Sequence, residues 1–156
     1  MAALGHPIRE AERYLQNARQ ILSDKAEKDG DYYNDTKYVR MAGNTAWNGV
    51  LIALDAALGV KKKMKPKQRP DVQDYQLALH NRDSKMNIVL LSAYESLHKA
   101  LGYDGNPNYK IVQSALADGQ RLIEWADKNY HPTPEEIATW EKKPNIFNRI
   151  YSYLFM

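Results

Sequence analysis

Arg82 occupies the position in this sequence that most suggests a chemical role. It lies three residues after Leu79 and four before Met86, which on a helix places it in an apolar seam. A guanidinium buried there needs a carboxylate or several other acceptors, because an unpaired buried charge is very costly. We expect Asp55 to be that partner in a structural ion pair. The alternative is an anion or nucleotide contact made by Arg82 in a cleft.

Histidines and glutamates could supply acid–base or metal chemistry. Glu95 and His98 form a Glu-x-x-His pair, but carboxylate di-iron bundles need two such pairs and two further inward glutamates. We therefore expect a polar helix flank and no metal site. His80 or His98 beside Arg82 would be the residues of a nuclease-related enzyme or of a nucleotide- or RNA-binding module.

Other catalytic and cofactor-binding patterns are missing from the sequence. It has no cysteine, which excludes disulfides and thiolate chemistry, and it has no Gly-rich phosphate loop, nucleophile elbow or paired-His motif. We expect no cofactor. A non-enzymatic binding protein is the favoured interpretation, and the enzyme or nucleotide-binding module stays the alternative.

A basic loop interrupts an otherwise mildly acidic chain. Six of the nine residues from 61 to 69 are basic, whereas the remaining chain has 16 basic and 19 acidic residues. These six are Lys61, Lys62, Lys63, Lys65, Lys67 and Arg69. The loop could bind nucleic-acid phosphates, but it has no aromatic residue to stack on bases. We favour a solvated loop and expect no tight nucleic-acid binding at about 150 mM salt.

Asn44 and Asn48 lie one helical turn apart and continue from Arg40 as a polar strip. The strip could line a pocket or a dimer contact. An exposed helix face is the favoured interpretation.

Helical periodicity extends through most of the chain, and strand-like alternation is absent. We predict helices over residues 7–28, 35–58, 71–101, about 108–130 and 133–142, a final piece from Asn145, and no sheet. The basic linker covers 60–70, and Thr133, Pro134 and Glu136 form a capping box. The fold class is thus all-α: a four-helix up-down bundle with one or two short C-terminal helices, as a single domain over 1–156.

The helix predicted over 35–58 carries a stripe of small residues beside a stripe of large apolar ones. Ala46, Gly49 and Ala53 belong to the small stripe, and Trp47 and Leu51 to the large one. Small residues let a second helix approach closely. We expect this helix to be central and its small stripe to face a neighbouring helix.

Three short stretches carry a resemblance to a known fold. They are Ala11-x-x-Tyr14-Leu15-x-x-Ala18-Arg19, the Ala-rich segment ending at Leu58, and Ser92 to His98 followed by Gly102-Tyr103-Asp104-Gly105. Over residues 7 to 128 the chain resembles the HEPN-like fold (higher eukaryotes and prokaryotes nucleotide-binding domain), and within it an uncharacterised family of small bacterial helical proteins. The resemblance implies a bundle that often dimerises, and in some relatives a ribonuclease with Arg followed by His after four to six residues. No arginine here has a histidine at that spacing.

The bulk of the sequence is that of an ordinary globular protein. Hydrophobic residues make up 44% and charged residues 26%. The first residues lack the basic start and long apolar run of a secretory signal, and no run reaches the ~20 apolar residues of a membrane span. We expect a cytoplasmic homodimer that does not contact the membrane and that has an unidentified macromolecular partner.

Overall fold

The structure, a computed structural model, describes residues 5–142, which are mostly helical. The helices are α1 (Pro7–Lys25), α2 (Thr36–Leu58), α3 (Val72–Arg82), α4 (Ser84–Ala93), a π-helix (Tyr94–Tyr103), α5 (Tyr109–Asn129) and α6 (Pro134–Lys142), with a 3-10 turn at Lys61–Lys63. The prediction of a mostly helical protein is confirmed. No helix within the described range is long and apolar enough to cross a membrane.

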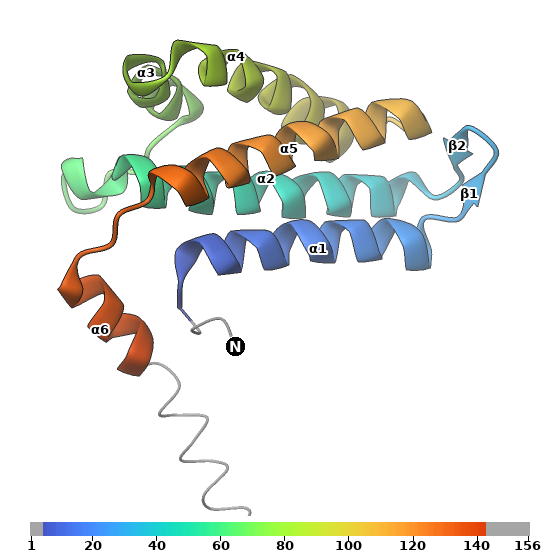
Figure 1. Ribbon diagram of the computed structural model, residues 1–156. Helices are drawn as coiled ribbons and strands as arrows, with labels where there is room; N and C mark the ends of the chain where they lie inside the picture. The colour runs from blue at the N-terminus through green and yellow to red at the C-terminus, as the bar shows by residue number, and fades with distance from the viewer. Residues whose placement is uncertain (1–4, 143–156) are drawn as a thin grey trace, which may run out of the picture.

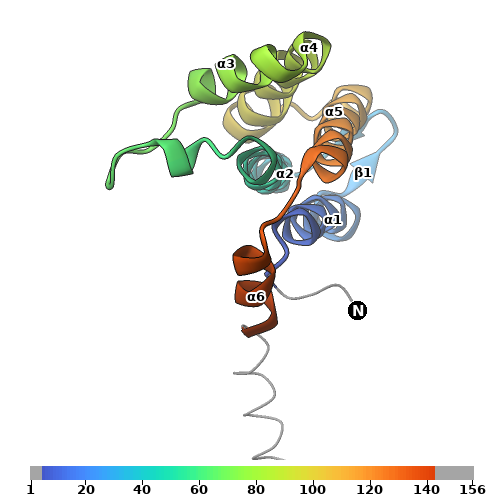
Figure 2. The same cartoon turned by 60° about the vertical axis from the view of Figure 1, so that its left-hand side comes forward.

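Helix α2 is central to the fold. Helices α1, α2 and α5 lie side by side, and α3, α4 and the π-helix lie across them as a second layer (Figures 1 and 2). Helix α2 packs against α1, α5 and the π-helix. Apolar residues at helical spacing along α1 and α5 form their inner faces and are all buried: Ile8, Ala11, Leu15, Ala18, Leu22, Val112, Ala115, Leu116, Leu122, Ile123 and Ala126.

Helix ends follow the capping residues in the sequence. Asp35 caps α2 by accepting the Lys37 N–H at 3.2 Å, and Asn108 caps α5 by accepting the Ile111 N–H at 3.1 Å. Gly59 ends α2 with a left-handed φ of 66°, which glycine adopts without strain.

Two predictions are wrong in the segment that follows α1. The first helix is shorter than predicted, and a small β-hairpin is present where no sheet was expected. Helix α1 ends at Lys25, and β1 (Lys28–Asp29) pairs antiparallel with β2 (Tyr32–Tyr33). Gly30, at φ 60°, makes the turn. Strands of two residues are too short to show alternation, which is why the sequence pattern did not reveal them.

The helix predicted over 71–101 is divided at Asp83. This residue has an extended backbone, and its carboxylate accepts the Met86 N–H at 3.0 Å as the N-cap of α4. The other carboxylate oxygen accepts the indole N–H of Trp125 on α5 at 3.0 Å. Beyond α4, the chain continues as the π-helix. A π-helix is a rare form that is often found at functional sites.

Two glycines of α2 allow its neighbours to approach closely. A Cβ on Gly43 would lie 2.6 Å from Leu101 Cβ and 2.6 Å from the Gly102 backbone nitrogen in the π-helix. A Cβ on Gly49 would lie 2.9 Å from Tyr14 Cβ in α1. The close contact predicted for the small stripe is confirmed, with Ala46 and Ala53 fully buried.

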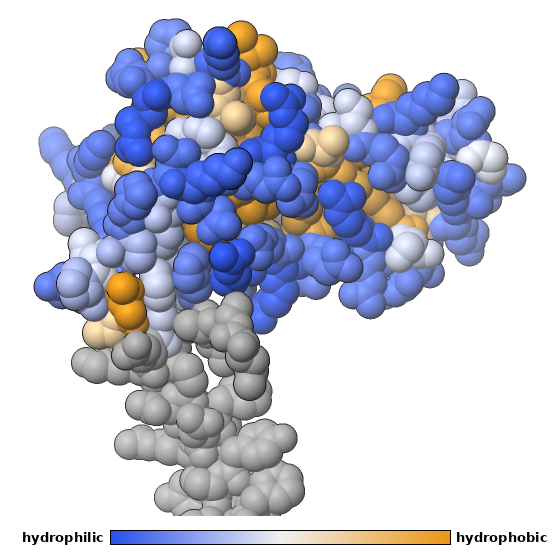
Figure 3. Space-filling model, in the orientation of Figure 1, coloured by the Kyte–Doolittle hydropathy of each residue, from blue (hydrophilic) through white to orange (hydrophobic). Residues whose placement is uncertain are grey.

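Helix α6 packs beside the start of α1, where His6 lies against Trp140 with ring centroids 4.5 Å apart. Thr133 caps it by accepting the Glu136 N–H at 3.2 Å, as predicted. The final piece predicted from Asn145 lies outside the described residues. The surface in Figure 3 is mostly hydrophilic, and apolar side chains show in patches among the polar ones.

Candidate functional site: a cationic groove on α2

The predicted ion pair between Arg82 and Asp55 does not form. Arg82 is exposed at the last residue of α3, and Asp55 instead accepts the Lys61 N–H at 2.9 Å and the Tyr75 hydroxyl at 3.5 Å. The prediction assumed one helical phase from 71 to 101, and the break at Asp83 ends that phase directly after Arg82.

The histidines and Glu95 do not come together with Arg82. His80 is exposed on α3, and Glu95 is exposed and paired with Lys99 at 3.1 Å. His98 is half-buried in the π-helix and stacks on Tyr94, with ring centroids 5.3 Å apart. Among residues 5–142, no three His, Asp or Glu side chains lie close enough together to hold a metal ion.

The polar strip of α2 divides between two locations. Arg40 donates to the Tyr103 and Asp104 carbonyls at 3.3 and 3.4 Å, and Asn44 donates to the Gly102 carbonyl at 3.3 Å. The end of the π-helix is therefore connected to α2 by hydrogen bonds from these two side chains. Asn48, further along the strip, lines a cavity.

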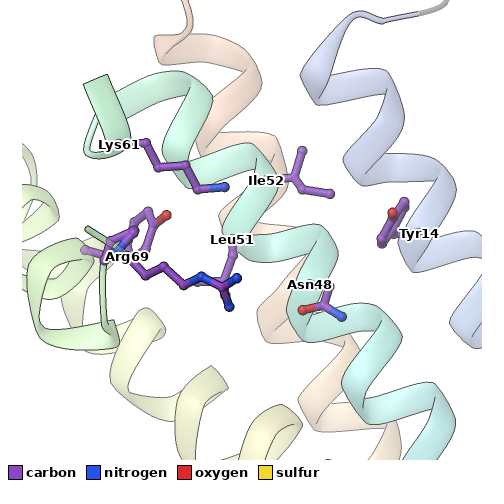
Figure 4. A pocket seen from close by; sticks show the side chains of 8 residues that line it. Tyr14, Asn48, Leu51, Ile52, Lys61 and Arg69 are labelled. Carbon is purple, nitrogen blue, oxygen red and sulfur yellow. The ribbon is translucent and has the colours of Figure 1, made fainter. Parts of the chain in front are cut away.

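That cavity, here called the cationic groove, has a volume of about 560 Å³ and lies between α1, α2 and the basic loop. Its lining residues are Tyr14, Asn48, Leu51, Ile52, Lys61, Arg69, Pro70 and Tyr75. Figure 4 shows the Lys61 and Arg69 side chains reaching from the loop across α2, toward Ile52 and Leu51. The groove thus joins an apolar floor to two cationic groups and the amide of Asn48.

Only part of the basic loop contributes to the groove. Lys61 and Arg69, at its two ends, line the cavity, and neither makes an ion pair with any described residue. Lys62 is paired with Glu136 of α6 at 2.8 Å. The remaining lysines, Lys63, Lys65 and Lys67, are exposed. Of the six basic side chains of the loop, Lys61 and Arg69 therefore line the groove.

Tyr75 supplies a neutral hydroxyl at the groove. Burial raises the pKa of this phenol, and the neighbouring Asp55 carboxylate raises it further. Tyr75 therefore stays protonated at physiological pH. Asp55 does not line the groove, and its carboxylate already accepts the hydrogen bonds from Lys61 and Tyr75.

A second cavity, here called the aromatic pocket, adjoins the groove. It has a volume of about 230 Å³ and shares Leu51, Pro70 and Tyr75 with the groove. Its other lining residues are Trp47, Asp71, Val72, Tyr94 and His98. The sequence did not mark Tyr14, Tyr75 or Tyr94 as site residues, because their helical spacing is equally typical of a core.

Most of this chain is similar to a known protein family. The family described as "Domain of unknown function (DUF5618)" matches residues 6–128. The chain belongs to this family. The family match covers α1 to nearly the end of α5, and so includes every residue of the cationic groove, whereas α6 lies beyond it.

A solved structure of a protein of unknown function from Dyadobacter fermentans is similar, with 39% sequence identity and a TM-score of 0.74. The similarity covers 82% of this chain and 98% of that one. No curated protein matches the sequence significantly.

Proposed function

We propose that this chain is a non-enzymatic binding protein whose cationic groove holds the anionic group of a ligand. The observation that carries the proposal is the lining of the groove, in which Lys61 and Arg69 reach over an apolar floor and none of the described lining residues is a carboxylate. Ligand sites are typically concave and mostly apolar, with a few convergent polar groups.

The chemistry of the lining supports an anion as the bound group. Arg69 presents a planar fork of donors that matches a phosphate or carboxylate, and Lys61 adds a point charge. Asn48 adds a neutral amide donor at the same cavity, whereas the Tyr75 hydroxyl already donates to Asp55. Because both cationic side chains are exposed, salt screens the attraction, and binding weakens as ionic strength rises.

The placement of the titratable groups supports binding rather than catalysis. A catalytic base or nucleophile needs a partner that orients it. His80 and Arg82 are exposed on α3, and neither lines the groove or the aromatic pocket, so they do not join His98 in a common cleft. The alternative, a nuclease-related or nucleotide-binding module built on Arg82 with His80 or His98, has less support.

The resemblance to the HEPN-like fold adds further expectations about the bundle, its assembly and its location. We propose a HEPN-like variant of the bundle, assembled as a homodimer in the cytoplasm and lacking the Arg–His pair of the ribonucleases. The central position of α2 supports the bundle part of this assignment.

The test measures binding of inorganic phosphate to the full chain by isothermal titration calorimetry at low salt. A Lys61→Met/Arg69→Met variant should bind at least about tenfold more weakly, a loss of about 1.4 kcal/mol. The matched control, Lys65→Met/Lys67→Met, removes the same charge from the same loop outside the groove and should bind nearly as tightly as wild type. Equal weakening in both variants would mean that only the loop's net charge matters.

A further inference from the structure

The cationic groove and the aromatic pocket form one continuous surface. They share Leu51, Pro70 and Tyr75, so a molecule in the groove that passes Leu51 enters the pocket. Trp47 and Leu51 are one helical turn apart on α2, which corresponds to about 6 Å along the helix. The aromatic rings therefore lie within reach of a small ligand whose charged end is at Arg69.

The pocket is built to hold a flat, apolar group. The rings of Trp47, Tyr94 and His98 pack together, with centroids 5.3 to 5.7 Å apart. An apolar cavity of about 150 Å³ is large enough for benzene, and this one has about 230 Å³. Among the described lining residues, Asp71 carries the one carboxylate, and it is the N-cap of α3, where it accepts the Asp74 N–H at 3.1 Å.

His98 gives the pocket one directional polar group. Its Nδ1 atom is buried and has no hydrogen-bond partner among the described residues. The ring lines the pocket, so its other nitrogen, Nε2, on the opposite edge, is the polar atom of His98 that is left to contact a ligand there.

Resting on the proposed function, we infer that the ligand is an aromatic anion, in which a phosphate or carboxylate is joined to a planar ring. The anionic group lies between Lys61 and Arg69. The ring lies against Tyr94 and His98, where stacking and apolar burial strengthen binding. His98 Nε2 can form a hydrogen bond with a polar atom on the ring. The π-helix contributes to this site because it carries both Tyr94 and His98.

The test compares two probes on the full chain, inorganic phosphate and phenyl phosphate, by titration calorimetry. Phenyl phosphate should bind at least about tenfold more tightly than phosphate. Tyr94→Leu, which keeps apolar volume but removes the ring, should lose most of that advantage and leave phosphate affinity unchanged. Lys61→Met/Arg69→Met should weaken both probes.

A filling variant keeps the test decisive if Tyr94→Leu does not fold. Val72→Phe enlarges a half-buried side chain of the pocket lining and should remove the advantage of phenyl phosphate without changing phosphate affinity. Equal affinity of the wild type for the two probes would overturn this inference and leave the anion site intact. Failure of both probes to bind would overturn the proposed function and this inference with it. An advantage that persists in both variants would place the ring elsewhere and also overturn the inference.

Discussion

Gly43 lies at a helix contact that leaves no space for a side chain. An added Cβ would meet atoms of Leu97, Leu101 and Gly102 at 2.6 to 2.8 Å, and two of those three atoms belong to the backbone. The π-helix therefore lies against α2 at a distance that requires glycine. The same contact is fastened nearby by Arg40 and Asn44.

Gly43→Ala should therefore lower the free energy of unfolding by about 1–3 kcal/mol, because the added methyl forces α2 and the π-helix apart. The matched control is Gly119→Ala on α5, where the added Cβ would meet a Leu97 methyl at 3.2 Å. That methyl can move, and alanine gains helix propensity, so the control should be close to neutral. Urea denaturation measures both, and similar losses in the two variants would contradict the account of this contact.

Single residues on strongly periodic helices were predictable, whereas residues near breaks were not. Ile8 and Leu15 are buried, as the helical period of α1 implies, since this period is uninterrupted and one face must meet the core. Arg82 was placed in a seam only because the helix was assumed to continue. Lys61 and Arg69 were recognised as basic, but only the folded loop shows that these two reach a cavity.

At the scale of elements, Asp83 sets the direction of the second layer. Its carboxylate caps the N-terminus of α4 and accepts a hydrogen bond from Trp125 of α5. One side chain therefore links the break between α3 and α4 to the first layer. An Asp before a helical segment is a capping signal. The apolar periodicity on both sides concealed it, because α3 and α4 each keep helical spacing.

Asp83→Ala should destabilise the protein by about 2–3 kcal/mol, since it removes an N-cap and leaves the Trp125 indole N–H without its acceptor. Asp83→Asn keeps one acceptor oxygen and presents an NH2 group in place of the other, so it can retain the N-cap but not the hydrogen bond from Trp125. It should therefore recover only part of the loss. Thermal unfolding followed by circular dichroism measures the difference, and an alanine variant that unfolds like wild type would contradict the importance of these two hydrogen bonds.

The stability that Glu136 contributes by attaching α6 to the rest of the fold should be lost at acid pH. The hydrogen bonds of Glu136 with Lys62 and Tyr130 lower the pKa of this carboxyl below its ordinary value. A lowered folded-state pKa gives stability that is present above the unfolded pKa of about 4.5 and is lost as pH falls through the folded value. Glu136→Gln should remove that part of the pH dependence.

Urea denaturation at pH 7 and pH 3 measures this effect. The difference in unfolding free energy between the two pH values should be smaller in Glu136→Gln than in wild type. Glu135→Gln, the adjacent and exposed carboxylate, is the matched control and should behave like wild type. An unchanged pH dependence in Glu136→Gln would mean that these hydrogen bonds do not form in solution.

For the whole molecule, the mostly helical fold and the central role of α2 followed from periodicity and from the small-residue stripe. The crossing of α3, α4 and the π-helix over the first layer did not, because it depends on a break and on long-range contacts such as Asp83 with Trp125. The groove is lined by residues that lie far apart in the sequence, such as Tyr14 and Arg69. No local sequence motif could therefore reveal it.

The homodimer is a prediction at this same scale. Light scattering coupled to size-exclusion chromatography should give twice the chain mass of 17.9 kDa at micromolar concentration. A mass of one chain at all accessible concentrations would contradict it. The cationic groove is formed within one chain, so phosphate binding should persist in either case.

We expect the cationic groove to bind an anion at Lys61 and Arg69. Chemical-shift mapping of the ¹⁵N-labelled chain with inorganic phosphate tests this binding without any substitution and locates the bound anion. Saturable shifts should be concentrated at Asn48, Leu51, Lys61, Arg69 and Tyr75. Shifts spread evenly over the exposed lysines Lys63, Lys65 and Lys67, without saturation, or centred on Arg82 and His80, would contradict it.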